Sequence, residues 1–237
     1  MKISVIGCGY VGLVSSACFA HLGHTVVCID HDPRVVTSIN SANPHFYEPS
    51  LTELLEEGLR SRRLKATGPE DSPILESDVT FICVGTPDDG GVIDLEQIRA
   101  AATLIGRAIA KKNEPHIIVT KSTVVPGTNV NLIENEISLH VPKKQFAVCM
   151  NPEFLRQGSA VKDFMEPDRI VIGSNEIQTA KVVSRIYKNL SANKLLTSIQ
   201  NAELIKYASN ALLGTLISFS NEISNICDGT PNSDVNV

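Results

Sequence analysis

The stretch Met1-Lys-Ile-Ser-Val-Ile6, followed directly by Gly7-Cys-Gly-Tyr-Val-Gly12, decides the fold of this chain. The apolar run predicts a buried strand, and the spacing G-x-G-x-x-G predicts a tight turn that opens a helix over residues 13–22. A second strand is predicted at Thr25–Ile29, and it ends at Asp30. This order of strand, glycine turn, helix, strand and acidic residue is typical of a dinucleotide-binding βαβ unit.

Each glycine of the turn has a physical reason. Gly7 permits the tight turn, Gly9 lets the backbone approach a pyrophosphate, and Gly12 lets the helix pack closely on the strand. The helix N-terminus adds free N–H groups and the positive end of the helix dipole. Asp30 lies eighteen residues after Gly12, where a carboxylate accepts hydrogen bonds from a ribose diol and repels a 2′-phosphate. The sequence therefore predicts that NAD binds in preference to NADP.

Two other interpretations of this region are weaker. A glycine-rich turn of an unrelated α/β protein would not require both strands, the helix and Asp30 together. Residues 3–22 are almost uncharged, which also suggests a signal peptide or a membrane helix. Three glycines in six residues and the immediate return to a strand argue against a membrane segment.

The composition is that of an ordinary soluble protein. The 237 residues suffice for one large α/β domain and part of a second, with 43% apolar and 20% charged residues and a net charge of −5. The densest basic run, Arg60–Lys65, follows a Glu-rich helix pattern, so we expect a solvated helix end and no nucleic-acid site.

Six cysteines are present, and none lies in a C-x-x-C motif or near a His pair at metal-binding spacing. No metal site is therefore expected. Cys28, Cys83 and Cys149 lie in apolar strand patterns, which predicts buried, inert thiols. Reduced thiols and the absence of a signal-sequence pattern favour the cytoplasm.

The rest of the chain alternates strand and helix patterns, which predicts an α/β fold: a Rossmann-type, doubly wound, mainly parallel sheet. Strands are expected at 79–84, 116–120, 146–150 and 169–172, the last of the series, and helices from Pro33, at 51–59, at 94–112 and at 177–187. Three of these strands end in polar loops that carry Thr86, Thr123 or Glu153. Ligands of doubly wound sheets bind outside the carboxyl ends of the strands.

The alternation stops near residue 200, where Gln200–Ile226 has the apolar spacing of one long helix, about 40 Å at 1.5 Å per residue. We therefore expect a Rossmann domain over residues 1–198 and the start of a central helical domain over 199–237. A helix of this length usually spans between domains or lines an interface. Its exposed apolar area predicts homodimerisation through the helix.

Two groups of polar residues suggest catalysis. Pro152 fixes the turn that carries Glu153, which places a carboxylate at the ligand edge of the sheet, where it can act as general base or hold a water. Lys206 and Asn210 are separated by four residues and share one helix face, so they could stabilise an oxyanion. The alternatives are an ordinary surface loop for Glu153 and a solvated stripe for the helix pair.

The chain resembles the nucleotide-sugar 6-dehydrogenases, which act on UDP-glucose, GDP-mannose or UDP-N-acetylmannosamine. The matching motifs run in family order over nearly the whole chain: Gly7–Gly12, Phe81–Pro87, Lys121–Thr123 with Pro126–Thr128, Asn151–Arg156, Pro167–Gly173, and Ala202–Lys206 with Asn210. Lys121–Thr123 resembles the UDP-glucose enzymes, whereas Val124–Gly127 resembles the GDP-mannose enzymes. The sugar therefore stays open between these types.

The resemblance implies oxidation of the sugar C6 alcohol to a carboxylate, with two NAD⁺ and a covalent cysteine thioester. It implies acid/base or water-holding roles for Glu153 and Thr123, and oxyanion stabilisation by Lys206 and Asn210. It assigns the cofactor to Gly7, Gly9, Tyr10, Val11, Gly12, Asp30, Val84, Gly85, Thr86, Pro87, Ser122, Thr123 and Gln157. It assigns the substrate to Glu153, Phe154, Leu155, Arg156, Lys206 and Asn210.

The sequence departs from the family pattern in two places. Gln157 stands where many members have a glutamate. No cysteine has the neighbours of the family's Gly-Gly-x-Cys-x-Pro nucleophile motif, and the family chain is nearly twice as long. We therefore expect an N-terminal fragment that binds NAD and is inactive alone.

Two other classes of function fit the sequence less well. A non-catalytic NAD-binding module would not need Glu153, Lys206 and Asn210. A hydroxyacid dehydrogenase would need a catalytic His or a Tyr/Lys pair, for which His116 and His140 are poorly placed.

Overall fold

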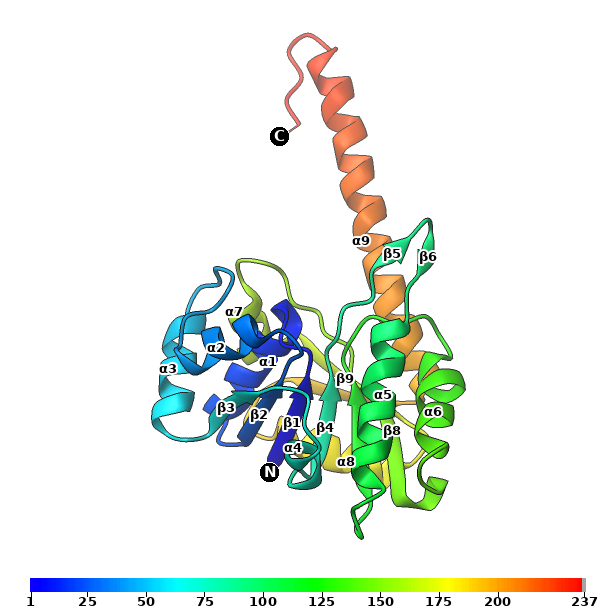
Figure 1. Ribbon diagram of the computed structural model, residues 1–237. Helices are drawn as coiled ribbons and strands as arrows, with labels where there is room; N and C mark the ends of the chain where they lie inside the picture. Colours follow the sequence, from blue (N-terminus) through cyan, green and yellow to red (C-terminus); the bar gives the residue numbers. More distant parts are fainter. Residues whose placement is uncertain (236–237) are drawn as a thin grey trace.

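The computed structural model describes residues 1–235, in which an eight-stranded sheet lies between two layers of helices (Figure 1). The strands lie in the order β3-β2-β1-β4-β7-β8-β9-β10. Those from β3 to β8 are parallel, β9 is antiparallel to β8, and β10 is parallel to β9. Their bounds are β1 Lys2–Ile6, β2 Thr25–Ile29, β3 Leu64–Thr67, β4 Val79–Ile82, β7 His116–Thr120, β8 Phe146–Met150, β9 Arg169–Ser174 and β10 Asn193–Thr197.

Two apolar clusters, one on each face of the sheet, form the core. The first lies under α1 (Tyr10–His21), α2 (Pro33–Asn40), α3 (Leu51–Arg60), α7 (Ala160–Met165) and α8 (Ile177–Ile186). The second lies under α4 (Ser72–Leu75), α5 (Glu96–Ile109), the π-helical turn η1 (Asn129–Ile133), α6 (Glu134–Ser138) and the start of α9 (Ile199–Asp228). Helices on both faces of a mainly parallel sheet confirm the predicted Rossmann-type architecture.

The predicted strands at 25–29, 116–120 and 146–150 have the observed bounds, but ending the series at residue 172 was wrong. The sheet has two further strands, β3 and β10, and both lie at its edges. Edge strands are buried on fewer sides, so they can be short and polar: β10 reads Asn-Lys-Leu-Leu-Thr and is half exposed. The basic run after α3 likewise continues into β3, whose first residue is Leu64. The short elements η2 (Lys143–Gln145), β5 (Asp88–Asp89) and β6 (Val92–Ile93) complete the fold.

The strand order brings the predicted ligand loops side by side. β1, β4, β7 and β8 are consecutive neighbours, and all four run in the same direction. The glycine turn follows β1, and the loops with Thr86, Thr123 and Glu153 follow β4, β7 and β8. From β1 the sheet grows first toward β2 and then on its other side toward β4, which makes the end of β1 the switch point of the sheet.

The long helix α9 confirms the helix predicted at 200–226. It has 30 residues, and the hydroxyl of its N-cap Ser198 accepts a hydrogen bond from the backbone N–H of Asn201. Its first two turns pack on the sheet, and the remainder extends away from it past the carboxyl ends of the strands (Figure 1). Among residues 1–235, none of the helices combines the length and the apolar character needed to cross a membrane.

Candidate active site

The glycines of the turn have distinct geometric roles. Gly7 has a φ of +86°, and a Cβ atom there would lie 2.9 Å from the carbonyl oxygen of Cys83. A Cβ on Gly12 would lie 1.9 Å from the Gly7 carbonyl oxygen, so any side chain at residue 12 would prevent the helix from approaching the strand this closely. A Cβ on Gly9 would meet nothing within 4 Å, and this residue faces open space. Gly7 and Gly12 therefore serve the backbone, whereas Gly9 leaves room for a ligand.

The start of α1 remains available to an anion. Gly9 is the N-cap and provides no side-chain cap, and Tyr10 and Val11 form the first turn. The N–H groups of such a turn lack partners within the helix, and they carry the positive end of the helix dipole. These features fit the phosphates of a dinucleotide.

Asp30 fixes the turn as well as facing the ligand edge. Its carboxylate is 8% exposed, and it accepts hydrogen bonds from the backbone N–H of Cys8 at 2.7 Å and of Asp32 at 2.9 Å. Each carboxylate oxygen has two lone pairs, so both can still accept from a ribose hydroxyl. These two hydrogen bonds therefore fix the orientation of the Asp30 carboxylate before any ligand binds.

The loops after β4 and β7 are joined to each other. The Thr86 hydroxyl donates to the backbone carbonyl of Thr123 at 2.8 Å, and the Ser122 hydroxyl donates to that of Val84 at 2.7 Å. Gly85 and Pro87 are exposed in the same loop. The structure thus brings Val84–Pro87 and the Ser122–Thr123 pair together, as expected from the strand order.

The strongest electrostatic feature of the site is an ion pair between Glu153 and Lys206. The two atoms Oε1 and Nζ are 2.8 Å apart, and the side chains are only 12% and 6% exposed. The other carboxylate oxygen of Glu153 accepts the backbone N–H of Leu155 at 2.5 Å. The ring of Phe154 covers the ammonium group, with its centroid 5.4 Å from Nζ. Residues 53 positions apart in the chain are therefore locked in one geometry.

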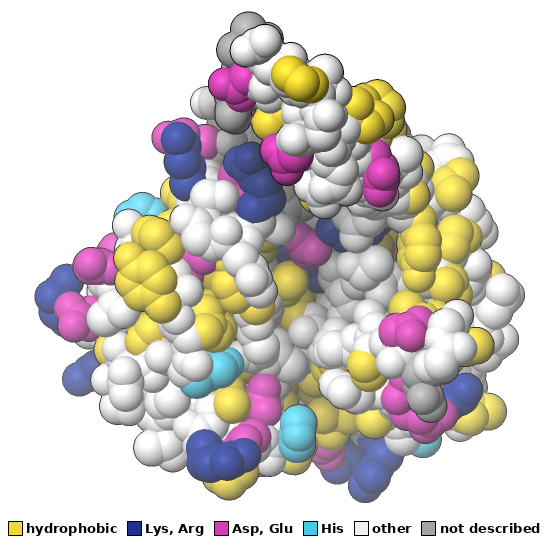
Figure 2. Space-filling model, turned by 90° about the horizontal axis from the view of Figure 1, so that it is seen from above, with side chains coloured by type: hydrophobic (Ala, Val, Ile, Leu, Met, Phe, Trp, Pro, Cys, Tyr) yellow, Lys and Arg dark blue, Asp and Glu magenta, His cyan; other side chains and the backbone are white. Residues whose placement is uncertain are grey.

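A groove of about 590 Å³ opens beside this ion pair. Figure 2, which looks onto the carboxyl ends of the strands, shows that this face of the molecule is hollowed between its two halves. Five of the predicted substrate residues line the groove: Phe154, Leu155, Arg156, Lys206 and Asn210. The sixth, Glu153, lies behind Lys206, to which it is ion-paired. The guanidinium of Arg156 is held by the carboxylate of Asp163, at 2.7 Å, and Asn210 is exposed one turn beyond Lys206. Gln157 is exposed next to Arg156.

Two buried charged residues support the site although the sequence, which includes them in family motifs, predicts no role for them. Lys121 is 4% exposed and donates to the Asn151 side-chain oxygen at 3.2 Å, and burial lowers its pKa to about 8. Glu203 is fully buried in α9 and accepts three hydrogen bonds, from the backbone N–H of Gly127 and from the backbone and side chain of Asn129. It thereby ties the loop that follows Thr123 to α9. A charge within an apolar pattern was the available signal in both cases.

Two cysteines of the core, Cys83 and Cys149, are poorly suited to nucleophilic attack. Cys28, Cys83 and Cys149 are buried, as predicted. Burial raises the pKa of Cys83 to about 12 and that of Cys149 to about 11. The thiolate is the reactive form, so Cys83 and Cys149 stay protonated and unreactive at neutral pH.

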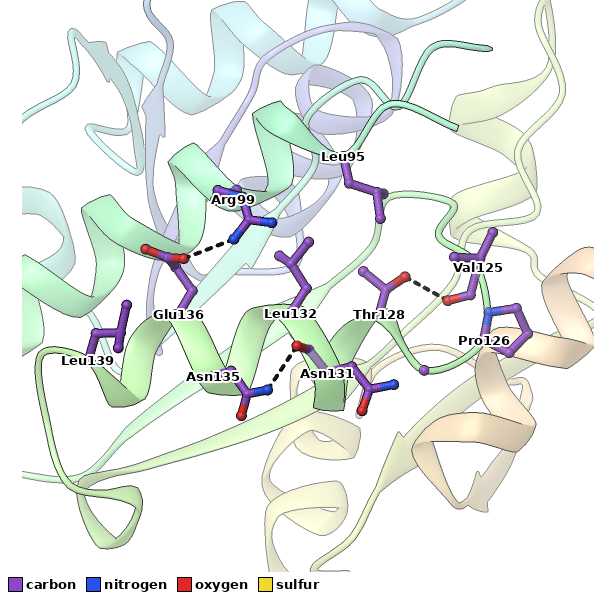
Figure 3. A pocket seen from close by; sticks show the side chains of 11 residues that line it. Leu95, Arg99, Val125, Pro126, Thr128, Asn131, Leu132, Asn135, Glu136 and Leu139 are labelled. Carbon is purple, nitrogen blue, oxygen red and sulfur yellow. Dashed lines mark hydrogen bonds and ion pairs between the residues drawn. The ribbon is translucent and has the colours of Figure 1, made fainter. Parts of the chain in front are cut away.

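A second hollow, of about 470 Å³, lies between α5 and the segment formed by η1 and α6 (Figure 3). The ion pair between Arg99 and Glu136 crosses its wall at 3.2 Å, and the Val125–Thr128 turn borders it. No residue predicted for the cofactor or the substrate lines this hollow. It is separate from the groove beside Lys206.

Comparison with known proteins matches most of the chain to one family. Residues 1–191 match the model of the UDP-glucose/GDP-mannose dehydrogenase family, NAD binding domain, and residues 200–237 match the central domain of that family. Among curated proteins, a UDP-glucose 6-dehydrogenase of Haloferax volcanii is 43% identical over 236 residues, which cover 96% of this chain and 54% of the relative. A GDP-mannose 6-dehydrogenase of Pseudomonas aeruginosa is 40% identical over 230 residues, which cover 95% and 53%.

Solved structures agree with these matches. A ternary complex of GDP-mannose dehydrogenase from Pseudomonas aeruginosa superposes with a TM-score of 0.96 at 38% identity, over 100% of this chain and 55% of that one. A UDP-glucose dehydrogenase from Pyrobaculum islandicum gives a TM-score of 0.92 at 43% identity, over 95% and 52%. The chain spans about half the length of the curated relatives that it matches.

Proposed function

The chain belongs to the UDP-glucose/GDP-mannose dehydrogenase family, and on that premise we propose that it forms the cofactor-binding part of an NAD-dependent nucleotide-sugar 6-dehydrogenase. The observation that carries this proposal is the meeting of the glycine turn and three polar loops on neighbouring strands, next to the buried Glu153–Lys206 pair. UDP-glucose is the first candidate substrate, because relatives 43% and 42% identical are named for it. GDP-mannose is the second, because the superposition on a GDP-mannose dehydrogenase has a TM-score of 0.96.

The family's NAD-binding domain implies NAD, and the residues present fit it. The uncapped start of α1 and the open space at Gly9 suit a pyrophosphate, and Asp30 suits an unphosphorylated ribose. The Val84–Pro87 and Ser122–Thr123 loops would complete this side of the site. When bound, NAD⁺ supplies the acceptor for the hydride that leaves the sugar.

The side chains around the groove would serve the sugar. Glu153 would take up a proton or hold the attacking water, together with Thr123. Lys206 keeps donor capacity besides its bond to Glu153, because an ammonium group has three N–H donors. With Asn210 it would donate to the oxyanion of a tetrahedral intermediate, and the pairing with Glu153 prevents Lys206 from being a free buried charge.

The resemblance also implies a cysteine nucleophile, which we do not assign to any thiol of this chain. The core thiols are buried, and Cys227 lies about 30 Å further along α9 than Lys206 at 1.5 Å per residue. We propose that this chain binds NAD⁺ but produces no NADH from nucleotide sugars by itself. Its free thiols also favour the cytoplasm as its location.

We further propose two structural units, residues 1–198 and 199–237, and a homodimer formed through α9. The outer part of the helix exposes a row of large apolar side chains, each 36–63% exposed: Leu212, Leu213, Leu216, Ile217, Phe219, Ile223 and Ile226. Apolar patches of this extent usually mark an interaction surface. A second copy of the same helix offers a matching apolar face.

A chimaera tests the proposed function. This chain would replace the matching part of the UDP-glucose 6-dehydrogenase of Haloferax volcanii, and NADH formation would be followed with UDP-glucose and with GDP-mannose. We expect turnover with one of the two sugars and its loss in the Lys206→Ala chimaera, with NAD⁺ binding retained in both. A folded chimaera that binds NAD⁺ and oxidises neither sugar would contradict the proposal, as would turnover by the 237-residue chain alone.

A further inference from the structure

A buried carboxylate outside the expected site, Glu48, joins the cofactor side of the molecule to the substrate side. Glu48 precedes α3 and is 4% exposed. Its Oε1 accepts the backbone N–H of Ala160 at 2.7 Å, and its Oε2 accepts that of Gly158 at 2.9 Å and the hydroxyl of Tyr10 at 2.5 Å. Within residues 1–235, no Lys, Arg or His forms an ion pair with it.

The partners of Glu48 belong to the two segments that hold different ligands in the proposed function. Tyr10 is the first residue of α1 in the glycine turn. Gly158 lies between the groove residue Arg156 and helix α7, and Ala160 is the first residue of α7. The Tyr10 hydroxyl also lies 3.2 Å from the backbone carbonyl of Arg156. Burial and the contact with Glu48 raise the pKa of Tyr10, so its proton stays in this link at neutral pH.

The link extends to the guanidinium of Arg156 in the groove. Asp163 lies in α7, and its carboxylate accepts the Arg156 side chain at 2.7 and 3.1 Å and the Arg156 backbone N–H at 2.9 Å. The hydroxyl of Ser159 donates to the same carboxylate at 3.0 Å. A shift in the first turn of α7 therefore moves Asp163, the only hydrogen-bond partner that the described residues give the Arg156 guanidinium.

We propose that Glu48 is a positioning residue that couples occupancy of the glycine turn to the arrangement of the segment from Arg156 to Ala160. The inference rests on the proposed function, because it takes NAD⁺ as the ligand of the turn. A buried carboxylate with no cation depends on all of its donors, since each lost hydrogen bond leaves part of the charge unsatisfied. When a ligand orders Tyr10, Glu48 holds Gly158 and Ala160 more firmly, and Arg156 with them.

Hydrogen exchange on the complete chain tests the coupling. Backbone exchange over residues 156–165 would be measured with and without saturating NAD⁺, in the wild type and in three variants. Glu48→Gln removes the charge, Tyr10→Phe removes only the hydroxyl that links the two segments, and Glu53→Gln is a control at an exposed carboxylate of α3. Calorimetry in parallel reports NAD⁺ binding itself, and thermal unfolding reports whether each variant is folded.

We expect NAD⁺ to slow exchange over residues 156–165 at least about five-fold in the wild type and in Glu53→Gln, the lower end of typical coupling between sites. At saturating NAD⁺, Tyr10→Phe should lose this effect although it keeps the backbone contacts of Glu48, and Glu48→Gln should also exchange faster without ligand. Equal protection in wild type and Tyr10→Phe would overturn the inference. Absence of NAD⁺ binding by the wild type would instead overturn the proposed function on which it rests.

Discussion

Two glycines of the same turn should respond in opposite ways to the addition of one methyl group. In Gly12→Ala the new Cβ would lie 1.9 Å from the Gly7 carbonyl oxygen and 3.1 Å from the Cys83 Cβ. The backbone of the turn must move, and overpacking of this kind costs about 3 kcal/mol, which lowers the melting temperature by roughly 6–12 °C in a domain of this size. In Gly9→Ala the Cβ meets nothing within 4 Å, and the φ of −66° suits alanine.

The free energy of unfolding of Gly9→Ala should therefore lie within about 1 kcal/mol of the wild-type value. Alanine lowers the conformational entropy of the unfolded chain, and this stabilisation offsets the poorer N-cap. Its methyl group nevertheless occupies the space that we assign to the pyrophosphate, so NAD⁺ affinity should fall at least about ten-fold, equivalent to about 1.4 kcal/mol. Thermal unfolding by circular dichroism gives the first quantity, and calorimetric titration with NAD⁺ gives the second. Wild-type affinity in Gly9→Ala, or destabilisation equal to that of Gly12→Ala, would refute the reasoning.

Three further predictions concern the core, the ion pair and the long helix. Burial, reinforced by the charge of Lys112, lowers the pKa of His116 to about 3. Between about pH 6.5 and this value, the unfolded chain binds a proton on His116 that the folded chain does not bind. The free energy of unfolding should therefore be at its full value above about pH 6.5 and fall by up to about 1.4 kcal/mol per pH unit below it. Urea titrations at several pH values should show a smaller fall in His116→Gln, and equal pH dependence would count against a neutral, buried histidine. Lys206→Met leaves the Glu153 carboxylate buried without its cation. The free energy of unfolding measured with urea should therefore fall by about 3–5 kcal/mol, and the additional change Glu153→Gln should largely restore it. Sedimentation velocity should show self-association of the wild type and a monomer for Leu212→Glu, which replaces an exposed side chain and should leave the circular dichroism spectrum of the folded chain unchanged; a monomeric wild type would contradict the dimer.

The central half of the sheet could be predicted from the sequence because its strands are buried on both faces. The runs that became β2, β7 and β8 are mostly apolar, and both of their ends were placed correctly, whereas β1 begins one residue later than predicted. The edge strand β3 alternates apolar and polar residues over only four positions, Leu-Lys-Ala-Thr, which is too short to stand out. The edge strand β10 contains lysine and half-exposed positions, so no continuous apolar run marks it. The reversed direction of β9 depends on how the chain crosses the sheet, which no local pattern records.

The residues of the candidate site also differ in how far the sequence alone predicts them. Glu153, Lys206 and Thr86 stand out because each is a polar residue after or within an apolar pattern. The contacts of Glu48 and Glu203 join residues 110 and 76 positions apart, and their importance follows from burial that only the folded chain creates. The ion pair between Glu153 and Lys206 belongs to the same class, because a sequence shows the two charges but not that they meet.

Calorimetric titration of the wild-type chain with NAD⁺ and with NADP⁺ tests the central claim most directly. The uncapped start of α1, the open space at Gly9 and the oriented carboxylate of Asp30 predict binding of NAD⁺ in the micromolar-to-millimolar range. NADP⁺ should bind at least about ten-fold more weakly, because its 2′-phosphate would face the Asp30 carboxylate. No heat with NAD⁺, or tighter binding of NADP⁺, would contradict the assignment of this turn as an NAD site.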